Sequence, residues 1–136
     1  MERTRVLLAE DHAGVARHLR HILEQEFDVV GVVQDGQALV DAAEQLSPDV
    51  IITDIGMPGV DGVAAAARIL QRNGAAKIVF VTDYNDPFLV QMSLVTGALG
   101  YVLKLTAGDE LVPAVHAALR GERHVTKRVG RSTMVT

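Results

Sequence analysis

Five side chains in this sequence stand at the ends of short apolar runs and are of types that bind cations and phosphoryl groups. Glu10 and Asp11 follow the first run, Asp54 follows the third, Thr82 ends the fourth and Lys104 follows the fifth. Carboxylates this close repel, since two unit charges ~4 Å apart interact by about 4 kcal/mol at an effective dielectric constant of 20. Either one carboxyl is protonated or a cation neutralises the group. Mg²⁺ fits, because it binds carboxylates, waters and phosphate oxygens.

Asp54 is the candidate nucleophile among the three carboxylates. A carboxylate that faces a metal-bound phosphoryl group can attack phosphorus and form an acyl phosphate. Glu10 and Asp11 are adjacent, which suits a metal pair, whereas Asp54 is followed by a Gly- and Pro-rich loop over 55–59. Such a loop lets the backbone approach an ion closely. With Lys104 and Thr82 to stabilise the phosphoryl oxygens, the set predicts phosphoryl transfer to an aspartate.

The elements that must position these side chains are short strands alternating with helices. The apolar runs are rich in Val and Ile and nearly continuous, as expected for parallel strands covered on both faces. They occupy residues 6–9, 29–33, 50–52, 78–81 and 101–103. Amphipathic stretches at helical spacing separate them, so we predict an α/β fold with a doubly wound parallel sheet. Ligands bind beyond the carboxyl ends of such strands, where the five side chains should converge.

Length and composition set the broad class of the protein. The 136 residues suit one domain, and 49% hydrophobic with 22% charged residues excludes general disorder. The chain contains no cysteine, which excludes disulfides, thiolate metal sites and cysteine catalysis. No apolar run approaches the ~20 residues of a membrane span, and none resembles a signal peptide. We therefore expect a cytoplasmic protein with no membrane partner.

Charge is distributed unevenly along the chain, whose net charge is −4. Residues 1–119 contain 16 acidic and 8 basic side chains, a net charge of −8, while residues 120–136 contain 5 basic and 1 acidic, a net charge of +4. An acidic body repels nucleic acid and attracts divalent cations. The basic end lacks aromatic residues and is more typical of a solvated linker. We predict a domain over 1–121 and, over 122–136, a basic tail or the start of a linker.

Several motifs, in order and on the expected elements, resemble the receiver domain of two-component response regulators. They are LLAEDH (Leu7–His12), DIGMPGVDG (Asp54–Gly62), Val81–Thr82 and GALGYVLK (Gly97–Lys104). The resemblance covers about residues 4–121 and is greatest to the NarL/FixJ type, with its LuxR-type output. It implies a flavodoxin-like (βα)5 fold whose five-stranded parallel sheet has strand order 2-1-3-4-5. Members of this type usually carry a C-terminal helix-turn-helix DNA-binding domain. We expect contact with DNA only through such a domain.

The resemblance also implies roles for individual residues. A sensor histidine kinase would donate its phosphoryl group to Asp54, and Thr82 and Lys104 would hold the phosphoryl oxygens. The implied Mg²⁺ ligands are Glu10, Asp11, Asp54 and the backbone carbonyl of Gly56. Such a protein is a signalling phosphoacceptor that catalyses only its own phosphorylation and dephosphorylation.

A switch is the second feature that the resemblance implies. The added charge would draw Thr82 inward and let Tyr101 swing toward the space that Thr82 leaves. That movement would remodel the surface formed by the fourth helix, fifth strand and fifth helix. Tyr101 is equally compatible with a packing aromatic at this position.

Two residues depart from the receiver pattern and leave an alternative open. Asp83 stands where the family usually has a small residue, and Leu105 stands where it usually has proline. We expect Asp83 to slow phosphorylation relative to an Asp83→Ala variant. Gly56 and Tyr84 are further candidate modulators. The alternative is a degenerate receiver that acts as a phosphorylation-independent interaction module. A Mg²⁺ phosphatase is disfavoured, because Gly56 stands where that class usually has a second aspartate.

The fourth helix carries a candidate partner surface. The apolar residues within 88–95 are not confined to one stripe, which is typical of a helix that is buried or packs on a partner. Phe88, Leu89 and Met92 are the candidate contacts, with a homodimer as the simplest partner. Overlap with the core is the alternative interpretation.

Overall fold

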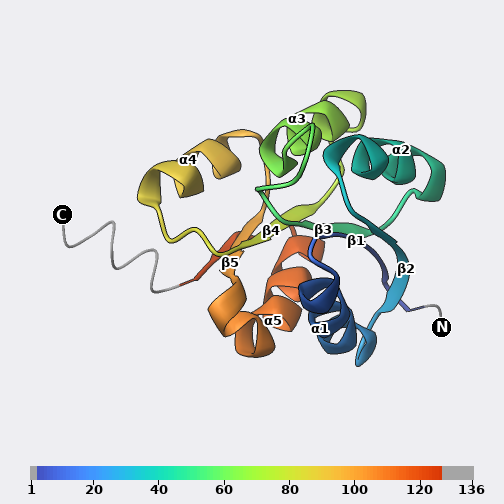
Figure 1. The fold of residues 1–136 in the computed structure, drawn as a ribbon, viewed down its shortest axis with the longest axis vertical. Helices are drawn as coiled ribbons and strands as arrows, with labels where there is room; N and C mark the ends of the chain where they lie inside the picture. Colours follow the sequence, from blue (N-terminus) through green and yellow to red (C-terminus); the bar gives the residue numbers. More distant parts are fainter. Residues whose placement is uncertain (1–2, 127–136) are drawn as a thin grey trace.

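A six-stranded parallel sheet forms the centre of the molecule. The structure is a computed structural model that describes residues 3–126. The strands are β1 (Arg5–Ala9), β2 (Asp28–Val33), β3 (Val50–Thr53), β4 (Ile78–Thr82), β5 (Gly100–Leu103) and β6 (His124–Val125). Their order is β2-β1-β3-β4-β5-β6, and each neighbouring pair is parallel (Figure 1). The predicted α/β class and the order 2-1-3-4-5 are therefore confirmed, with β6 added at one edge.

Burial of the strands explains why their sequences are nearly continuous apolar runs. Strands β3, β4 and β5 are buried along their whole length, because helices cover both faces of the sheet. Strand β2 lies at an edge and is only half-buried. The polar residues that follow the central strands consequently emerge together at the carboxyl edge of the sheet.

Five helices cover the two faces of the sheet. They are α1 (Ala13–Glu24), α2 (Gly36–Leu46), α3 (Gly62–Arg72), α4 (Pro87–Val95) and α5 (Ala107–Leu119). Helices α1 and α5 lie on one face, and α2, α3 and α4 lie on the other (Figure 1). Aspartates cap three of them: the side chains of Asp35, Asp61 and Asp86 accept hydrogen bonds from backbone amides of the first turn. These caps fix where each helix begins beside the carboxyl edge.

Two hydrophobic cores hold the layers together, one on each face. The core under α1 and α5 includes Leu8, Leu19 and Leu111. The core under α2, α3 and α4 includes Phe80 and the ring of Tyr101. Every helix is thus anchored to the sheet by burial of one face, although α4 buries only Val90 and Ser93.

The sixth strand is a feature that the sequence analysis did not predict. His124 pairs with Gly100 and Val125 pairs with Tyr101, so the first residues of the expected basic tail extend the sheet. Two residues are too few for a periodic pattern, which is why hydropathy did not reveal this strand. The remaining tail residues, 127–136, lie outside the described residues, and the boundary at 121 remains a prediction. None of the helices in residues 3–126 has the length and hydrophobicity that a transmembrane span requires.

Candidate functional site

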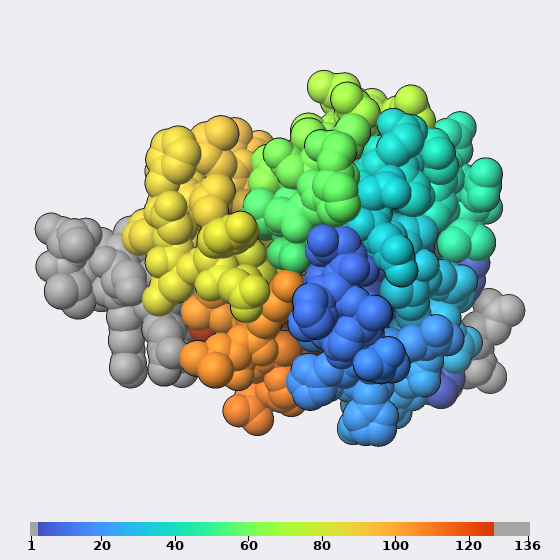
Figure 2. Space-filling model, in the orientation of Figure 1, coloured from blue at the N-terminus to red at the C-terminus, as the bar shows by residue number. Residues whose placement is uncertain are grey.

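A pocket of about 280 Å³ lies at the carboxyl edge of the sheet. Segments that are far apart in the sequence form it, and they come from the ends of β1, β3, β4 and β5. Blue, green, yellow and orange segments, the colours of these stretches, meet near the middle of the face in Figure 2. The lining residues are Glu10, Asp11, His12, Val15, Asp54, Gly56, Thr82, Asp83, Tyr84 and Lys104.

Three carboxylates form the acidic centre of this pocket. Glu10, Asp11 and Asp54 each offer an oxygen within 4.8 Å of the others. Glu10 and Asp54 are buried, with 1% and 6% exposure, whereas Asp11 is exposed. Backbone amides hold the buried pair: Ile55 N donates to Asp54 Oδ1 at 2.7 Å, and His12 N donates to Glu10 Oε2 at 3.0 Å. These bonds orient the two carboxylates so that their other oxygens face Lys104.

Lys104 provides the positive charge opposite the carboxylates. Its Nζ lies 2.7 Å from Glu10 Oε1 and 3.0 Å from Asp54 Oδ2. Burial lowers the pKa of Lys104, but hydrogen bonds to Glu10 and Asp54 and their negative charges outweigh burial, so the pKa is raised. The lysine begins a short 3₁₀ turn, Lys104–Thr106, whose middle residue, Leu105, projects into solvent. Leucine in place of the family's proline therefore does not keep Lys104 from the pocket.

The charges of the pocket match a divalent cation. Three carboxylates and one ammonium group leave a formal charge of −2 in a partly buried space. Hard oxygen ligands at an open pocket suit Mg²⁺, which keeps several waters and binds through few carboxylates. Gly56, the fourth predicted ligand, lines the same pocket.

Thr82 and Tyr101 are connected through the loop that follows β4. Thr82 is fully buried, and its Oγ1 accepts a hydrogen bond of 3.3 Å from Tyr84 N. Tyr101 does not line the pocket. Its ring is buried in the core, and its hydroxyl donates to the Tyr84 carbonyl at 2.7 Å. Thr82 therefore binds the backbone amide of Tyr84, and Tyr101 binds the carbonyl of the same residue.

Burial of the Tyr101 hydroxyl has an electrostatic consequence. Desolvation, followed by the negative charges of Asp86 and Asp54, raises the pKa of Tyr101 to about 12. The hydroxyl is therefore neutral and able to donate its hydrogen bond across the physiological range.

Asp83 and Tyr84 stand at the mouth of the pocket. The Asp83 side chain is 80% exposed, and its Oδ2 lies 3.9 Å from Lys104 Nζ. Tyr84 is half-exposed, and its hydroxyl would lie 3.3 Å from a Cβ placed on Gly56. A glycine at position 56 thus leaves room for the tyrosine ring over the pocket.

The start of α3 fits tightly against the backbone of Asp54. A Cβ on Gly62 would lie 1.9 Å from the carbonyl oxygen of Asp54, so only glycine allows this approach. Gly62 N also donates to the carbonyl of Ile55 at 2.7 Å. The loop after β3 is therefore fixed at both ends, which holds Asp54 in place.

The predicted partner residues lie outside the pocket, on α4. Phe88 and Met92 are exposed, by 68% and 46%, whereas Leu89 is partly buried. Val95, 82% exposed, continues the same helical face at i+7 from Phe88. In Figure 2 no described element covers the visible side of α4, drawn in yellow.

His12 is a lining residue that the sequence analysis missed. Its backbone amide binds Glu10, and its ring Nδ1 accepts a hydrogen bond from Val15 N at 3.4 Å, which caps α1. The available signal was its position directly after the acidic pair at the end of β1, where α1 must begin.

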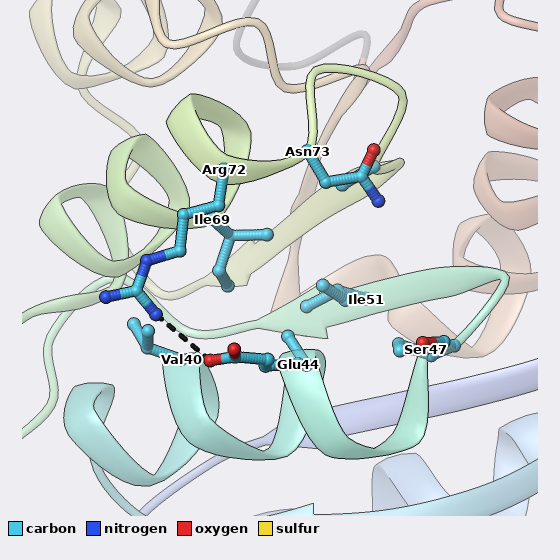
Figure 3. Close-up of a pocket in the computed structure, with 10 residues that line it drawn as sticks. Val40, Glu44, Ser47, Ile51, Ile69, Arg72 and Asn73 are labelled. Carbon is cyan, nitrogen blue, oxygen red and sulfur yellow. Dashed lines mark hydrogen bonds and ion pairs between the residues drawn. The ribbon is translucent and has the colours of Figure 1, made fainter.

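A larger pocket, of about 390 Å³, lies between α2 and α3 at the opposite edge of the sheet (Figure 3). Apolar residues such as Ile51, on β3, and Ile69, on α3, line it. Its two charged lining residues pair with each other, with Arg72 Nη1 3.2 Å from Glu44 Oε2. No residue of the acidic pocket lines it, so the candidate chemistry belongs to the carboxyl edge.

Comparison with known proteins identifies the family. Residues 6–116 match the family described as the response regulator receiver domain. This chain belongs to that family. Receiver domains are signalling modules rather than classical enzymes, and they bind Mg²⁺ at an acidic pocket of the kind that Glu10, Asp11 and Asp54 form here.

Curated relatives are bacterial transcriptional regulators. LiaR of Bacillus subtilis is 38% identical over 127 residues, which cover 92% of this chain and 60% of LiaR. PdtaR of Mycobacterium tuberculosis is 36% identical over 127 residues, covering 93% of this chain and 62% of PdtaR. The chain thus spans about 60% of the length of these relatives.

Solved structures agree with the receiver fold and with the predicted subfamily. A LuxR-family response regulator from Aurantimonas has a TM-score of 0.93 at 28% identity, covering 99% of this chain and 100% of that one. The isolated receiver domain of RcsB from Salmonella enterica, solved with the phosphoryl mimic BeF₃⁻, has a TM-score of 0.87 at 31% identity, covering 96% and 98%. The resemblance to the NarL and LuxR type is therefore confirmed.

Proposed function

We propose that this receiver domain accepts a phosphoryl group on Asp54 from a phosphohistidine of a sensor histidine kinase. The observation that supports the proposal most strongly is the geometry around Asp54. Its Oδ2 faces Lys104 Nζ at 3.0 Å inside a pocket that also contains Glu10 and Asp11. A buried carboxylate with a fixed cation and two neighbouring acidic groups is suited to phosphoryl transfer.

The chain's own residues divide the work of the transfer. A carboxylate oxygen of Asp54 attacks phosphorus, the bond from phosphorus to the donor nitrogen breaks, and the imidazole leaves with the electron pair. Lys104 moves from the carboxylate to an equatorial phosphoryl oxygen, whose charge it offsets. The Thr82 hydroxyl donates a hydrogen bond to another of these oxygens. The Ile55 amide, 2.7 Å from Asp54 Oδ1, keeps the carboxylate oriented throughout.

Mg²⁺ is the cofactor in this proposal. When bound, it neutralises the acidic centre and the phosphoryl oxygens, so that an anionic donor can approach. Glu10, Asp11 and Asp54 would hold it through carboxylate oxygens and Gly56 through its backbone carbonyl. The formal charge of −2 on the set of Glu10, Asp11, Asp54 and Lys104 supports a divalent ion.

Thr82 and Tyr101 form the switch in this proposal. Both bind the Tyr84 backbone, Thr82 by accepting from its amide and Tyr101 by donating to its carbonyl. When Thr82 turns toward a phosphoryl oxygen it gives up the Tyr84 amide. The loop before α4 then loses one of its two anchors, which changes the surface formed by α4, β5 and α5.

The output of the signal is the control of transcription through a C-terminal helix-turn-helix DNA-binding domain. The relatives LiaR and PdtaR are transcriptional regulatory proteins, and this chain spans about 60% of their length. Solved structures of the relative RcsB include dimers bound to DNA. We therefore infer that a further domain contacts DNA, and that phosphorylation of Asp54 in the receiver controls that domain.

Intact-mass measurement after incubation with Mg²⁺ and acetyl phosphate tests the proposal. We expect one added phosphoryl group in the wild type and none in Asp54→Asn, with the addition abolished by a chelator. Asp41→Asn is the matched control, because Asp41 is an exposed aspartate on α2 outside the pocket. No added mass, with Mg²⁺ binding retained, would contradict the proposal and support the phosphorylation-independent module instead.

A further inference from the structure

The last described residues of the chain cover the outer edge of β5. His124 N donates to the Leu99 carbonyl and Thr126 N donates to the Tyr101 carbonyl, each at 2.9 Å. In return, Leu103 N donates to Thr126 Oγ1 at 3.0 Å. Residues 124–126, which we call the β6 latch, thereby pair the edge of the strand that leads into Lys104.

Thr126 is the central residue of the β6 latch. Its side chain is buried, with 2% exposure, although it is a polar residue in a basic stretch of the sequence. It binds β5 on both sides of Val102, at the carbonyl of Tyr101 and at the amide of Leu103. Tyr101 is the proposed switch residue and Leu103 directly precedes Lys104, so Thr126 bridges the two functional parts of β5.

Helix α5 supports the β6 latch from the other side. Glu110 Oε1 lies 3.0 Å from His124 Nε2, and both side chains are mostly buried. Burial raises the pKa of Glu110, but hydrogen bonds to Thr106, His124 and Thr126 and the charge of His124 outweigh it, so the pKa is lowered. The latch is thus held by a carboxylate on α5 as well as by the backbone of β5.

We propose that the β6 latch couples the phosphorylation of Asp54 to the chain that follows Thr126, and that phosphorylation loosens it. This inference rests on the proposed function. Lys104 is now held by Asp54 and Glu10, and it must reorient toward a phosphoryl oxygen. The reorientation pulls on the turn that begins at Lys104 and weakens the adjacent bond from Leu103 N to Thr126. The response is a local opening of the strand and not a change of fold.

Amide hydrogen exchange of the full chain, followed residue by residue with and without Mg²⁺ and beryllofluoride, tests the coupling. We expect the amides of Leu103, His124 and Thr126 to exchange about three- to tenfold faster with the phosphoryl mimic, as for the loss of one ordinary hydrogen bond. Amides in β2, at the opposite edge of the sheet from β6, should not change. Asp54→Asn, which removes the site of attachment, should abolish the response.

Two substitutions at position 126 test whether the Thr126 hydroxyl transmits the response to phosphorylation or only stabilises the edge of β5. Thr126→Val keeps the shape of the side chain but removes the hydroxyl, so Leu103 should exchange fast with or without beryllofluoride. Thr126→Ser keeps the hydroxyl and should restore the wild-type response. Thr4→Val, before β1 and remote from β5, is the matched control.

The outcomes distinguish this inference from the proposed function. Beryllofluoride binding can be recognised from changes in the amide signal of Asp54. If it binds without faster amide exchange in residues 124–126, the latch proposal is overturned and the phosphoacceptor proposal stays intact. Slower exchange there would overturn it as well. A wild-type protein that neither binds beryllofluoride nor gains mass from acetyl phosphate would overturn both.

Discussion

Competition for one ammonium group dominates the site at the residue scale. Lys104 Nζ lies within 4.0 Å of carboxylates from Glu10, Asp54 and Asp83. The first two are buried and bind it strongly, whereas Asp83 is exposed, so solvent and salt weaken its attraction. Asp83 therefore acts mainly as a negative charge at the pocket mouth, where an anionic donor must enter.

Asp83→Asn should accelerate phosphorylation by acetyl phosphate at low ionic strength. We expect about a two- to fivefold increase, the size that follows when an exposed charge pair contributes up to about 1 kcal/mol. The difference should shrink as salt is added, because screening acts on exposed charges. Rates from intact mass over time, at two salt concentrations, provide the measurement. Equal rates for variant and wild type at low salt would show that Asp83 does not hinder the donor.

Tyr101→Phe should remove the hydrogen bond to Tyr84 and lower the free energy of unfolding by about 0.5–1.5 kcal/mol at neutral pH. The pKa of Tyr101 is raised to about 12 in the folded state, from 10.0. Its stabilising contribution is therefore fully present below pH 10 and is lost as the pH rises toward 12. Urea unfolding of both proteins at pH 8 and near pH 11 should show the gap narrowing. A gap that widens with pH would contradict the buried, neutral hydroxyl.

Close backbone packing positions the site at the scale of elements. Helix α3 begins against the carbonyl of Asp54, with no room for a side chain at Gly62. Helix α5 contains a glycine of the opposite kind, since a Cβ on Gly108 would meet nothing within 4 Å. The two positions lie near the starts of their helices and form a matched pair.

Gly62→Ala should destabilise the protein by about 1–3 kcal/mol, because the new methyl group clashes with backbone that cannot move away easily. Phosphorylation of Asp54 should slow in the same variant. Gly108→Ala should leave phosphorylation unchanged and stabilise the fold slightly, by up to about 1 kcal/mol, since alanine is the better helix former. Denaturant unfolding and intact mass report the two effects. If Gly62→Ala and Gly108→Ala were similarly stable, the close approach of Gly62 to the Asp54 carbonyl would be refuted.

Sequence patterns predicted the elements of this fold better than the contacts between them. Continuous Val- and Ile-rich runs identified five strands, and the polar residues after them identified the pocket. Strand β6 was not predicted, because two residues in an Arg-rich stretch show no hydrophobic periodicity. Thr106 directly precedes α5 without capping it, because a 3₁₀ turn comes before the helix and the Thr106 hydroxyl donates to the Leu103 carbonyl. Such details depend on distant strands that local patterns do not contain.

The arrangement of the whole molecule leaves one apolar helix uncovered in the described part of the chain. Helix α4 buries only Val90 and Ser93, while Phe88, Met92 and Val95 face solvent. It also adjoins the loop that Thr82 and Tyr101 bind. A surface of this kind is suited to association with a second copy of the chain.

Light scattering should show concentration-dependent dimers that increase with Mg²⁺ and beryllofluoride. Replacing Phe88 and Met92 together by alanine should abolish the dimers without lowering stability by more than about 0.5 kcal/mol, because both side chains are exposed. Arg17→Ala, on the exposed side of α1, is the control. A monomer at high concentration in both states would eliminate the dimer prediction.

The β6 latch also bears on how such regulators can be recombined. A chimaera that joins a foreign output module directly after Gly121 would discard residues 124–126. The edge of β5 would then present unpaired amides and carbonyls, a template for intermolecular strand addition and aggregation. A junction placed after Thr126 would keep that edge protected. Modular design with this receiver should therefore treat Thr126, and not the end of α5, as the last residue of the signalling unit.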